Sequence, residues 1–415
     1  MTSVSSDPHS SASRPSAPVA PVFDAVVVGG GPAGATAAEL LARSGRSVAL
    51  LDRDGRIKPC GGAVPPRLIR DFAIPDELIV ARARGARIIA PSARTVDMPI
   101  DDGYVGMVDR EFFDEALRVR ASEAGAVRIT GTFERISRNG DGLATVHFRE
   151  SRTGGEPKAV AGRVVIGADG ARSQVARQEV PGAGEGKCVF AYHEIIDMSD
   201  GAADGPASGD RCDVYYQSDL SPDFYAWIFP HGQTASVGTG SMQKGFGLRQ
   251  ATAALRERAG LAGAPTIRCE GAPIPLKPLK RWDNGRDVVL AGDAAGCVAP
   301  ASGEGIYYAM VGGQIAAEAA EEALATGNAR ALANARRRFM KLHGWVFWVL
   351  GVMQAFWYSS DRRRERFVSM CGDPDVQRLT WQSYMEKELV RADPLAHLKI
   401  FLKDSAHLLG LAKVS

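Results

Sequence analysis

Three glycines with GxGxxG spacing follow a short β-branched run near the start of the chain. Gly29 permits a tight turn, Gly31 lets the backbone approach a pyrophosphate, and Gly34 allows a helix to pack closely on the preceding strand. The helix after this turn is predicted from Ala33 to Ser44, and its first N–H groups are free to bind phosphate oxygens. This spacing predicts a site for a dinucleotide.

An acidic residue completes the predicted dinucleotide-binding unit. The next apolar run, residues 47–51, ends in Asp52, which lies about 18 residues after Gly34. A carboxylate at this point can accept hydrogen bonds from ribose hydroxyl groups and disfavours a 2′-phosphate there. A glycine-rich turn in an ordinary βαβ unit is the alternative interpretation.

Two further segments have the pattern of a buried strand that runs into a glycine–aspartate turn. The run 163–168 leads to Asp169, and the run 286–291 leads to Gly292 and Asp293. Either segment alone could be a simple strand and turn. Their order and spacing after the first motif are what make them informative.

Together the three motifs resemble the flavoprotein family that includes para-hydroxybenzoate hydroxylase and the geranylgeranyl reductases. The resemblance implies FAD as cofactor, with its ribityl chain at Asp293 and its ring at Gly305 and Ile306, where a helix is predicted to begin and to run to about residue 326. Arg110 matches a position that contacts FAD in the reductases. The implied cofactor-binding residues are Gly29, Gly31, Ala33, Gly34, Asp52, Gly61, Gly62, Arg110, Asp169, Gly292, Asp293, Gly305 and Ile306.

Two shorter segments resemble the geranylgeranyl reductases more specifically. One is Cys60-Gly61-Gly62, a loop that reaches the flavin in that family, so Cys60 is the candidate catalytic residue, either as a proton donor or as a wall of the alkene pocket. A packing cysteine is the alternative.

The other segment places Tyr225, Trp227 and Phe229 on one face of a predicted strand. Such an aromatic row suits an apolar isoprenoid, and these three residues are the candidate substrate-binding residues. Ordinary packing of side chains on a sheet explains the row equally well.

The predicted fold is α/β, with a Rossmann-type FAD-binding domain of the para-hydroxybenzoate hydroxylase kind, a strand-rich substrate domain and a helical C-terminal region. The FAD-binding domain is discontinuous over 22–64, 104–182 and 275–330. The substrate-binding domain is predicted over 65–103 and 183–274. A disordered leader covers 1–21, and the helical region covers 331–415.

The resemblance extends over nearly all of residues 22–410 and is nearest to the (bacterio)chlorophyll branch of the reductases. It implies an FAD-dependent, NADPH-driven enzyme that saturates the double bonds of a geranylgeranyl group to phytyl, on geranylgeranyl-bacteriochlorophyll or on geranylgeranyl diphosphate. No second GxGxxG is present, so the nicotinamide donor is expected to reach the flavin without a Rossmann domain of its own. That the donor is NADPH is implied by the resemblance to the family. A flavin monooxygenase acting on a lipophilic substrate, and a non-catalytic prenyl-binding protein on the same fold, remain as alternatives.

Charge and cysteine content exclude other classes of protein. The 50 basic and 48 acidic side chains leave a net charge of +2, which argues against a nucleic-acid binder driven by overall positive charge. The six cysteines form no CxxC pair and the seven histidines no HxxxH pair, so reduced thiols and no metal site are predicted. No secretory signal is visible in residues 1–21, which predicts a cytoplasmic protein.

One apolar segment suggests contact with a membrane. Residues 345–358 are apolar and aromatic, and Arg362, Arg363, Arg364 and Arg366 follow them. At about 14 residues the segment is too short to span a bilayer, which takes ~20. Peripheral docking on an anionic photosynthetic membrane and burial of a helix on the catalytic domain are the two interpretations.

Overall fold

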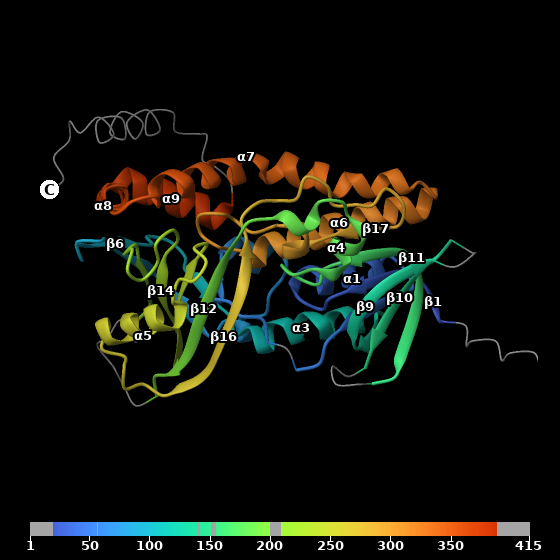
Figure 1. Ribbon diagram of the computed structural model, residues 1–415, viewed down its shortest axis with the longest axis horizontal. Coiled ribbons are helices and arrows are strands. Elements are labelled where there is room, and N and C mark those ends of the chain that lie inside the picture. The colour runs from blue at the N-terminus through green and yellow to red at the C-terminus, as the bar shows by residue number, and fades with distance from the viewer. Residues whose placement is uncertain (1–19, 56, 139–141, 151–154, 200–208, 388–415) are drawn as a thin grey trace, which may run out of the picture.

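The computed structural model describes residues 20–55, 57–138, 142–150, 155–199 and 209–387. Most of the predicted leader, and the end of the predicted helical region after residue 387, therefore lie outside the described residues. Two large sheets, one small sheet and a layer of helices make up the described part of the chain (Figure 1). The predicted α/β class, with a Rossmann-type sheet, a strand-rich second sheet and C-terminal helices, is confirmed.

The first sheet is built around β1, whose Ala25–Val28 run is fully buried, as expected for a parallel strand covered on both faces. β1 pairs in parallel with β2 and β11, and β11 pairs in parallel with β17. Within the described residues the strands are, in spatial order, β8 (Val127–Thr130), β2 (Val48–Asp52), β1 (Val22–Val28), β11 (Pro157–Gly167), β10 (Ala144–Arg149) and β9 (Thr132–Arg138), with β17 (Val288–Leu290) also on β11.

The second sheet is mainly antiparallel and carries the aromatic row predicted from the sequence. Its strands, among those the structure describes, run in the order β16 (Thr266–Pro275), β12 (Cys188–Asp197), β15 (Thr234–Ser241), β14 (Ala226–His231), β13 (Arg211–Tyr215), β5 (Gly85–Ile89) and β6 (Thr95–Pro99). A small sheet consists of β3 (Ala63–Val64), β7 (Val105–Met107) and β4 (Ala81–Ala83). β3 and β7 come from the ranges predicted for the FAD-binding domain, and β4 comes from a range predicted for the substrate-binding domain.

The strands of the first sheet come from the ranges predicted for the FAD-binding domain, and those of the second sheet come from the substrate ranges or end at their border. The substrate ranges also hold helices α2 and α5. The α-helices of the described chain are α1 (Pro32–Arg43), α2 (Pro66–Asp71), α3 (Arg110–Glu123), α4 (Gln174–Glu179), α5 (Leu248–Arg258), α6 (Ile306–Thr326), α7 (Asn334–Trp357), α8 (Asp361–Met370) and α9 (Pro374–Glu386).

Helix α6 has the bounds predicted for the helix after the third motif, and it packs against α1 beneath α7 (Figure 1). Helix α7 runs along one side of the molecule, and α8 and α9 follow at its end, near the second sheet. Trp357 of α7, which is buried, and Phe367 of α8, which is partly buried, join the apolar core behind β5 and β13. The C-terminal helices thus cover both sheets.

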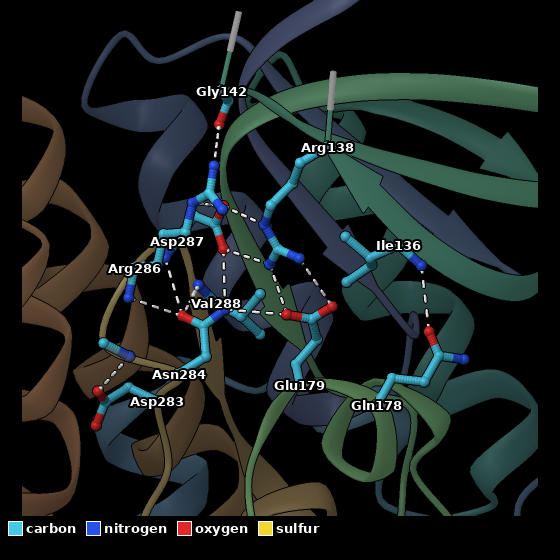
Figure 2. Close-up of polar contacts among 11 residues, drawn as sticks. Ile136, Arg138, Gly142, Gln178, Glu179, Asp283, Asn284, Arg286, Asp287 and Val288 are labelled. Carbon is cyan, nitrogen blue, oxygen red and sulfur yellow. Dashed lines mark hydrogen bonds and ion pairs between the residues drawn. The ribbon is translucent and has the colours of Figure 1, made fainter. Parts of the chain in front are cut away.

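A cluster of charged side chains ties the last strand of the first sheet in place (Figure 2). The guanidinium of Arg138 on β9 donates to both oxygens of Asp287, just before β17, and to both oxygens of Glu179 on α4. Asn284 donates to the same two carboxylates. Burial alone would raise the pKa of Asp287, but the hydrogen bonds from Arg138 and Asn284 hold it below its usual value.

Replacing Arg138 by alanine is expected to lower the free energy of unfolding by about 2 kcal/mol, less than the ~3–5 kcal/mol of a fully buried pair, because the Arg138 side chain is 18% exposed. The lowered pKa of Asp287 means that this stability is fully present above the unfolded-state pKa of about 4 and is lost as the pH falls below that value through the lower folded-state pKa. Urea unfolding of wild type and variant should show a difference that is constant from about pH 7 to about pH 5 and shrinks below about pH 4. A difference independent of pH would contradict this account.

Candidate functional site

All three sequence motifs meet at one edge of the first sheet. β1, β2, β11 and β17 are parallel, so their carboxyl ends lie side by side. The residues that follow these ends are Gly29, Asp52, Ala168-Asp169 and Gly292-Asp293. Ligands of open α/β sheets bind at this edge, where the chain can present backbone N–H groups and short turns.

The first turn has the shape that its glycines predict. A side chain at Gly34 would place its Cβ 1.8 Å from the carbonyl oxygen of Gly29, so helix and turn touch through bare backbone. At Gly31, which precedes α1, a Cβ would meet nothing within 4 Å, so this backbone faces open space. The turn therefore leaves room for a phosphate at the start of α1, next to Ala33.

A cleft of about 510 Å³ runs along this edge, within the range of small-molecule sites. Gly29, Gly31 and Ala33 line it near the first turn, and Asp52 and Asp169 line it further on. Its size, its bare backbone and its carboxylates fit a dinucleotide.

Asp52 and Asp169, two of the aspartates that line the cleft, differ in the hydrogen bonds that their carboxylates already accept. Asp52 lies 3.4 Å from the guanidinium of Arg118 and still faces the cleft. Asp169 accepts hydrogen bonds from the Ser173 hydroxyl and from the N–H groups of Gln174 and Val175, so its carboxylate holds the start of α4. Asp52 is thus the better placed of the two to accept from a ribose.

Asp293 lies at the inner end of the cleft. Its side chain is 7% exposed, and its Oδ2 forms an ion pair of 2.5 Å with Lys58. Among the described residues no donor reaches the other oxygen, Oδ1, which faces Gly305 at the start of α6. A ribityl hydroxyl could donate to this oxygen, and Gly292 and Ile306 lie beside it.

A second, mainly apolar pocket joins the cleft at Asp293. Both are lined by Pro32, Lys58, Ala272, Pro273, Asp293 and Ala309. The second pocket is also lined by Cys60, Gly61 and Arg110, by Gly305 and Ile306, and by the three aromatic residues predicted to bind substrate. The predicted catalytic, ring-contacting and substrate-binding residues therefore share one enclosure, while Gly62 lies just behind it, beside Val108 and His231.

The Cys60 thiol lies between a backbone donor and a buried cation. The N–H of Gly62 points at Sγ from 3.4 Å, and the buried guanidinium of Arg110 lines the same pocket and interacts electrostatically with the sulfur. Arg110 also donates to both oxygens of Asp114, one turn further along α3. Burial lowers the pKa of Arg110, but Asp114 and Cys60 outweigh burial and raise it, so this cation keeps its charge.

The aromatic row forms one wall of the pocket. The ring of Trp227 lies 6.0 Å from that of Tyr225 and 6.2 Å from that of Phe229, measured between centroids. Trp227 donates to the Ser236 hydroxyl, and Tyr225 donates to the carbonyl of Ser302 at 2.5 Å. Tyr225 thereby fastens the second sheet to the glycine-rich loop before α6.

That loop is fastened on its other side by a buried ion pair. Glu304 binds Lys387, which ends α9, and both side chains are almost fully buried. Burial raises the pKa of Glu304 and lowers that of Lys387, while each partner opposes the shift of the other. The C-terminal helices thus hold the loop that carries Gly305.

Sequence reasoning missed several residues of this enclosure. Lys58 stands two residues before Cys60, so its position in the sequence was a usable signal. His193 on β12 also lines the apolar pocket and contacts Ser236 and Glu270, but a lone histidine in a strand gives no signal. Glu304 and Lys387 are 83 positions apart, so only the tertiary structure brings them together.

Fold and site together define a mixed α/β protein with the fold of FAD-dependent oxidoreductases and a cleft that fits a dinucleotide. A family model described as pyridine nucleotide-disulphide oxidoreductase matches residues 23–203. The solved structure of a geranylgeranyl bacteriochlorophyll reductase-like protein from Thermoplasma acidophilum superposes with a TM-score of 0.76 at 22% identity, covering 91% of this chain and all of that one.

Curated relatives are more specific. The geranylgeranyl diphosphate reductase of Rhodobacter capsulatus is 59% identical over 389 residues, which are 94% of this chain and 98% of the relative. The enzyme of the same name from Synechocystis is 39% identical, with coverage of 94% and 98%. The chain therefore belongs to the geranylgeranyl reductase family of FAD-dependent oxidoreductases, as the motifs predicted.

Proposed function

We propose that this chain is an FAD-dependent, NADPH-driven reductase that saturates the double bonds of a geranylgeranyl group. The observation that carries the proposal is the junction at Asp293, where the dinucleotide cleft meets the apolar pocket that contains Cys60 and the aromatic row. A flavin ring at Gly305 and Ile306 would face that pocket. The names of the curated relatives support the same activity.

In the proposed cofactor site, each group of predicted residues binds a different part of FAD or supports a residue that does. The glycine turn and the start of α1 bind the pyrophosphate, Asp52 binds the ribose, and Asp293 binds the ribityl chain. Asp169 keeps the turn before α4 in shape, and Arg110 acts on the pocket through Cys60. The first sheet and its helices form the cofactor domain, and the second sheet forms the substrate domain.

An isolated alkene has no neighbouring carbonyl to polarise it, so its reduction needs a hydride on one carbon and a proton on the other. Bound FAD supplies the hydride, which it takes from NADPH. The chain supplies a dry enclosure, in which Trp227 and Phe229 exclude water and orient the prenyl tail. Cys60 stands at the wall of this enclosure and is the proposed proton donor.

The proposed substrate is a geranylgeranyl ester of bacteriochlorophyll, or geranylgeranyl diphosphate, which is the substrate that the relatives' names state. The test is anaerobic incubation of the purified enzyme with NADPH and each tailed compound. Product masses should rise in steps of two hydrogens, with NADP⁺ formed in equal amount to the bonds reduced.

The alternatives give different results in the same experiment. A monooxygenase would form product only when oxygen is admitted, and a prenyl-binding protein would bind the tail without oxidising NADPH. Identity of 59% to a named reductase argues against both.

Helix α7 has two distinct faces, and residues 345–358 are divided between them. Trp345 and Trp348 are 54% and 58% exposed, and their rings stack at 4.8 Å, whereas Phe347 is 5% exposed and belongs to the core. Trp357 and Tyr358 are buried as well. Burial on the protein therefore describes one face of the segment, and the other face is exposed.

The basic residues after α7 also need one correction. Arg364 is fully buried and donates to the carbonyls of Tyr358 and Pro222, so it is unavailable to a lipid head group. Arg362 and Arg363 are exposed, as are Arg337 and Lys341 on α7. Among the described residues no helix is long and apolar enough to cross a bilayer.

We infer peripheral contact between the outer face of α7 and an anionic lipid surface. The face combines exposed apolar side chains, Leu342, Trp345, Trp348 and Val352, with the basic residues nearby. Tryptophan side chains favour the boundary between head groups and acyl chains, and basic residues add about 1 kcal/mol each near an anionic surface. The enzyme would encounter the geranylgeranyl tail of its substrate, which has twenty carbons, most readily at such a surface.

Replacing Trp345 and Trp348 by serine should lower binding to vesicles that contain anionic lipid by about 10-fold or more, because two large apolar groups no longer enter the interface. Sedimentation with vesicles at low and high salt measures this, and the FAD content should stay unchanged. The matched control is Val22→Ser, an exposed apolar residue on β1, away from α7. Wild-type binding by the double variant would refute the membrane contact.

A further inference from the structure

A groove of about 380 Å³ opens on the surface beside the flavin cleft and has no role in the proposed site so far. It lies between β12, β16 and the start of α5. It shares Arg172, Gly271, Ala272 and Pro273 with the cleft, and Ala191 with the apolar pocket. An elongated molecule in the groove could therefore reach the junction at Asp293.

The lining of the groove is basic and aromatic. Arg172 and Arg249 are exposed, and none of the twelve lining residues is acidic. Within the described chain neither arginine has a carboxylate partner; the guanidinium of Arg249 lies 5.6 Å from the centre of the Tyr192 ring. Glu194, which accepts from the Tyr192 hydroxyl, is itself paired with Arg256.

Aromatic side chains frame these cations. Phe190 on β12 is 44% exposed and lines the groove, so the face of its ring is accessible to a ligand. Phe246, just before α5, lines the groove beside Tyr192. Aromatic rings next to free guanidinium groups match a nucleotide, since the rings can stack on a base and the arginines can bind phosphate.

We propose that this groove binds the adenosine end of NADPH, with Arg249 at the 2′-phosphate and the nicotinamide directed past Pro273 toward the flavin. The inference rests on the proposed function. It assigns a binding site to NADPH, for which the chain has no second GxGxxG motif. A prenyl diphosphate shares the phosphate chemistry. However, a diphosphate head group needs neither three aromatic rings nor a groove of this size.

Arg249→Ala in the holoenzyme is the direct test. We expect it to weaken binding of 2′,5′-ADP, measured by calorimetry, by about 10-fold or more, because a hydrogen-bonded charge pair is lost. The NADPH concentration that gives half-maximal anaerobic flavin reduction should rise similarly, whereas that of NADH, which lacks the 2′-phosphate, should change little. Arg249→Lys should restore part of the affinity.

Controls separate this proposal from its competitors. Lys244→Ala removes an exposed charge near the groove but outside its lining, and should leave 2′,5′-ADP binding unchanged. Tail reduction by dithionite-reduced enzyme bypasses NADPH and should be the same in wild type and Arg249→Ala.

Three results would count against the proposal in distinguishable ways. Equal 2′,5′-ADP affinity of wild type and Arg249→Ala would overturn the groove assignment while the reductase function stands. Impaired reduction of geranylgeranyl diphosphate by the dithionite-reduced variant would assign the groove to the substrate head group instead. Failure of reduced wild-type enzyme to saturate any tail would remove the proposed function itself.

Discussion

Cys60→Ser is expected to abolish most reduction of the prenyl tail while bound FAD is still reduced by NADPH. Serine keeps nearly the volume of cysteine, so the pocket beside Trp227 and Phe229 should stay closed. What changes is the acidity of the group that faces Arg110 and the Gly62 N–H. A positioned proton donor contributes ~10²- to 10⁴-fold, so tail reduction should fall by about 100-fold or more.

Single-turnover experiments can separate the two half-reactions of the Cys60 variant. Flavin bleaching by NADPH reports the first, and the mass of the tail after mixing with reduced enzyme reports the second. Cys269→Ser is the matched control, because Cys269 is an exposed thiol on β16 that does not line the pocket. Tail reduction at the wild-type rate in Cys60→Ser would reduce Cys60 to a packing role.

Asp293→Ala should yield protein that is largely free of flavin. The carboxylate lies at the inner end of the cleft with Oδ1 unbound and Oδ2 on Lys58, so its loss removes the partner of a buried ribityl hydroxyl and leaves a lysine without its anion. A hydrogen bond to a charged group contributes ~1.5–3 kcal/mol, which corresponds to a rise of about 10- to 150-fold in the dissociation constant of FAD.

Titration of apoprotein with FAD, followed by quenching of flavin fluorescence, measures this constant. Lys58→Met is the control that removes the ion pair but keeps the carboxylate, and it should bind FAD more tightly than Asp293→Ala does. Full flavin occupancy in Asp293→Ala would mean that Asp293 does not bind the ribityl chain, while the assignment of the fold would stand.

The sequence determined the family, the fold class and the edge of the sheet where the cofactor site lies. These features depend on short-range patterns: a glycine turn after a buried strand, an acid at a set distance, and a Gly-Asp turn before a helix. Because Gly34 would collide with Gly29 if it carried a side chain, the residue type and the local geometry imply each other. The start of α6 at Ile306 could be predicted for the same reason.

Only the tertiary structure decided which side chains act on one another across the chain. Arg110 was predicted to contact FAD, and the structure places it in the wall of the apolar pocket, where the docking of α3 under the Cys60 loop brings it to the Cys60 thiol. Lys387 reaches Glu304 from the end of α9. Neither of these two contacts follows from sequence spacing, because the partners lie on elements that meet only after the sheets have packed.

Residues 345–358 show, within one helix, the same difference between what the sequence predicts and what the tertiary structure decides. Composition predicted an apolar stretch, and both burial and lipid contact were consistent with it. Which of its residues are buried depends on the rotation of α7 about its axis, and this is set by the packing of Phe339 and Phe347 of α7 against Tyr308 of α6. That contact turns Trp345 and Trp348 outward, so packing on α6 decided which residues of the segment are exposed.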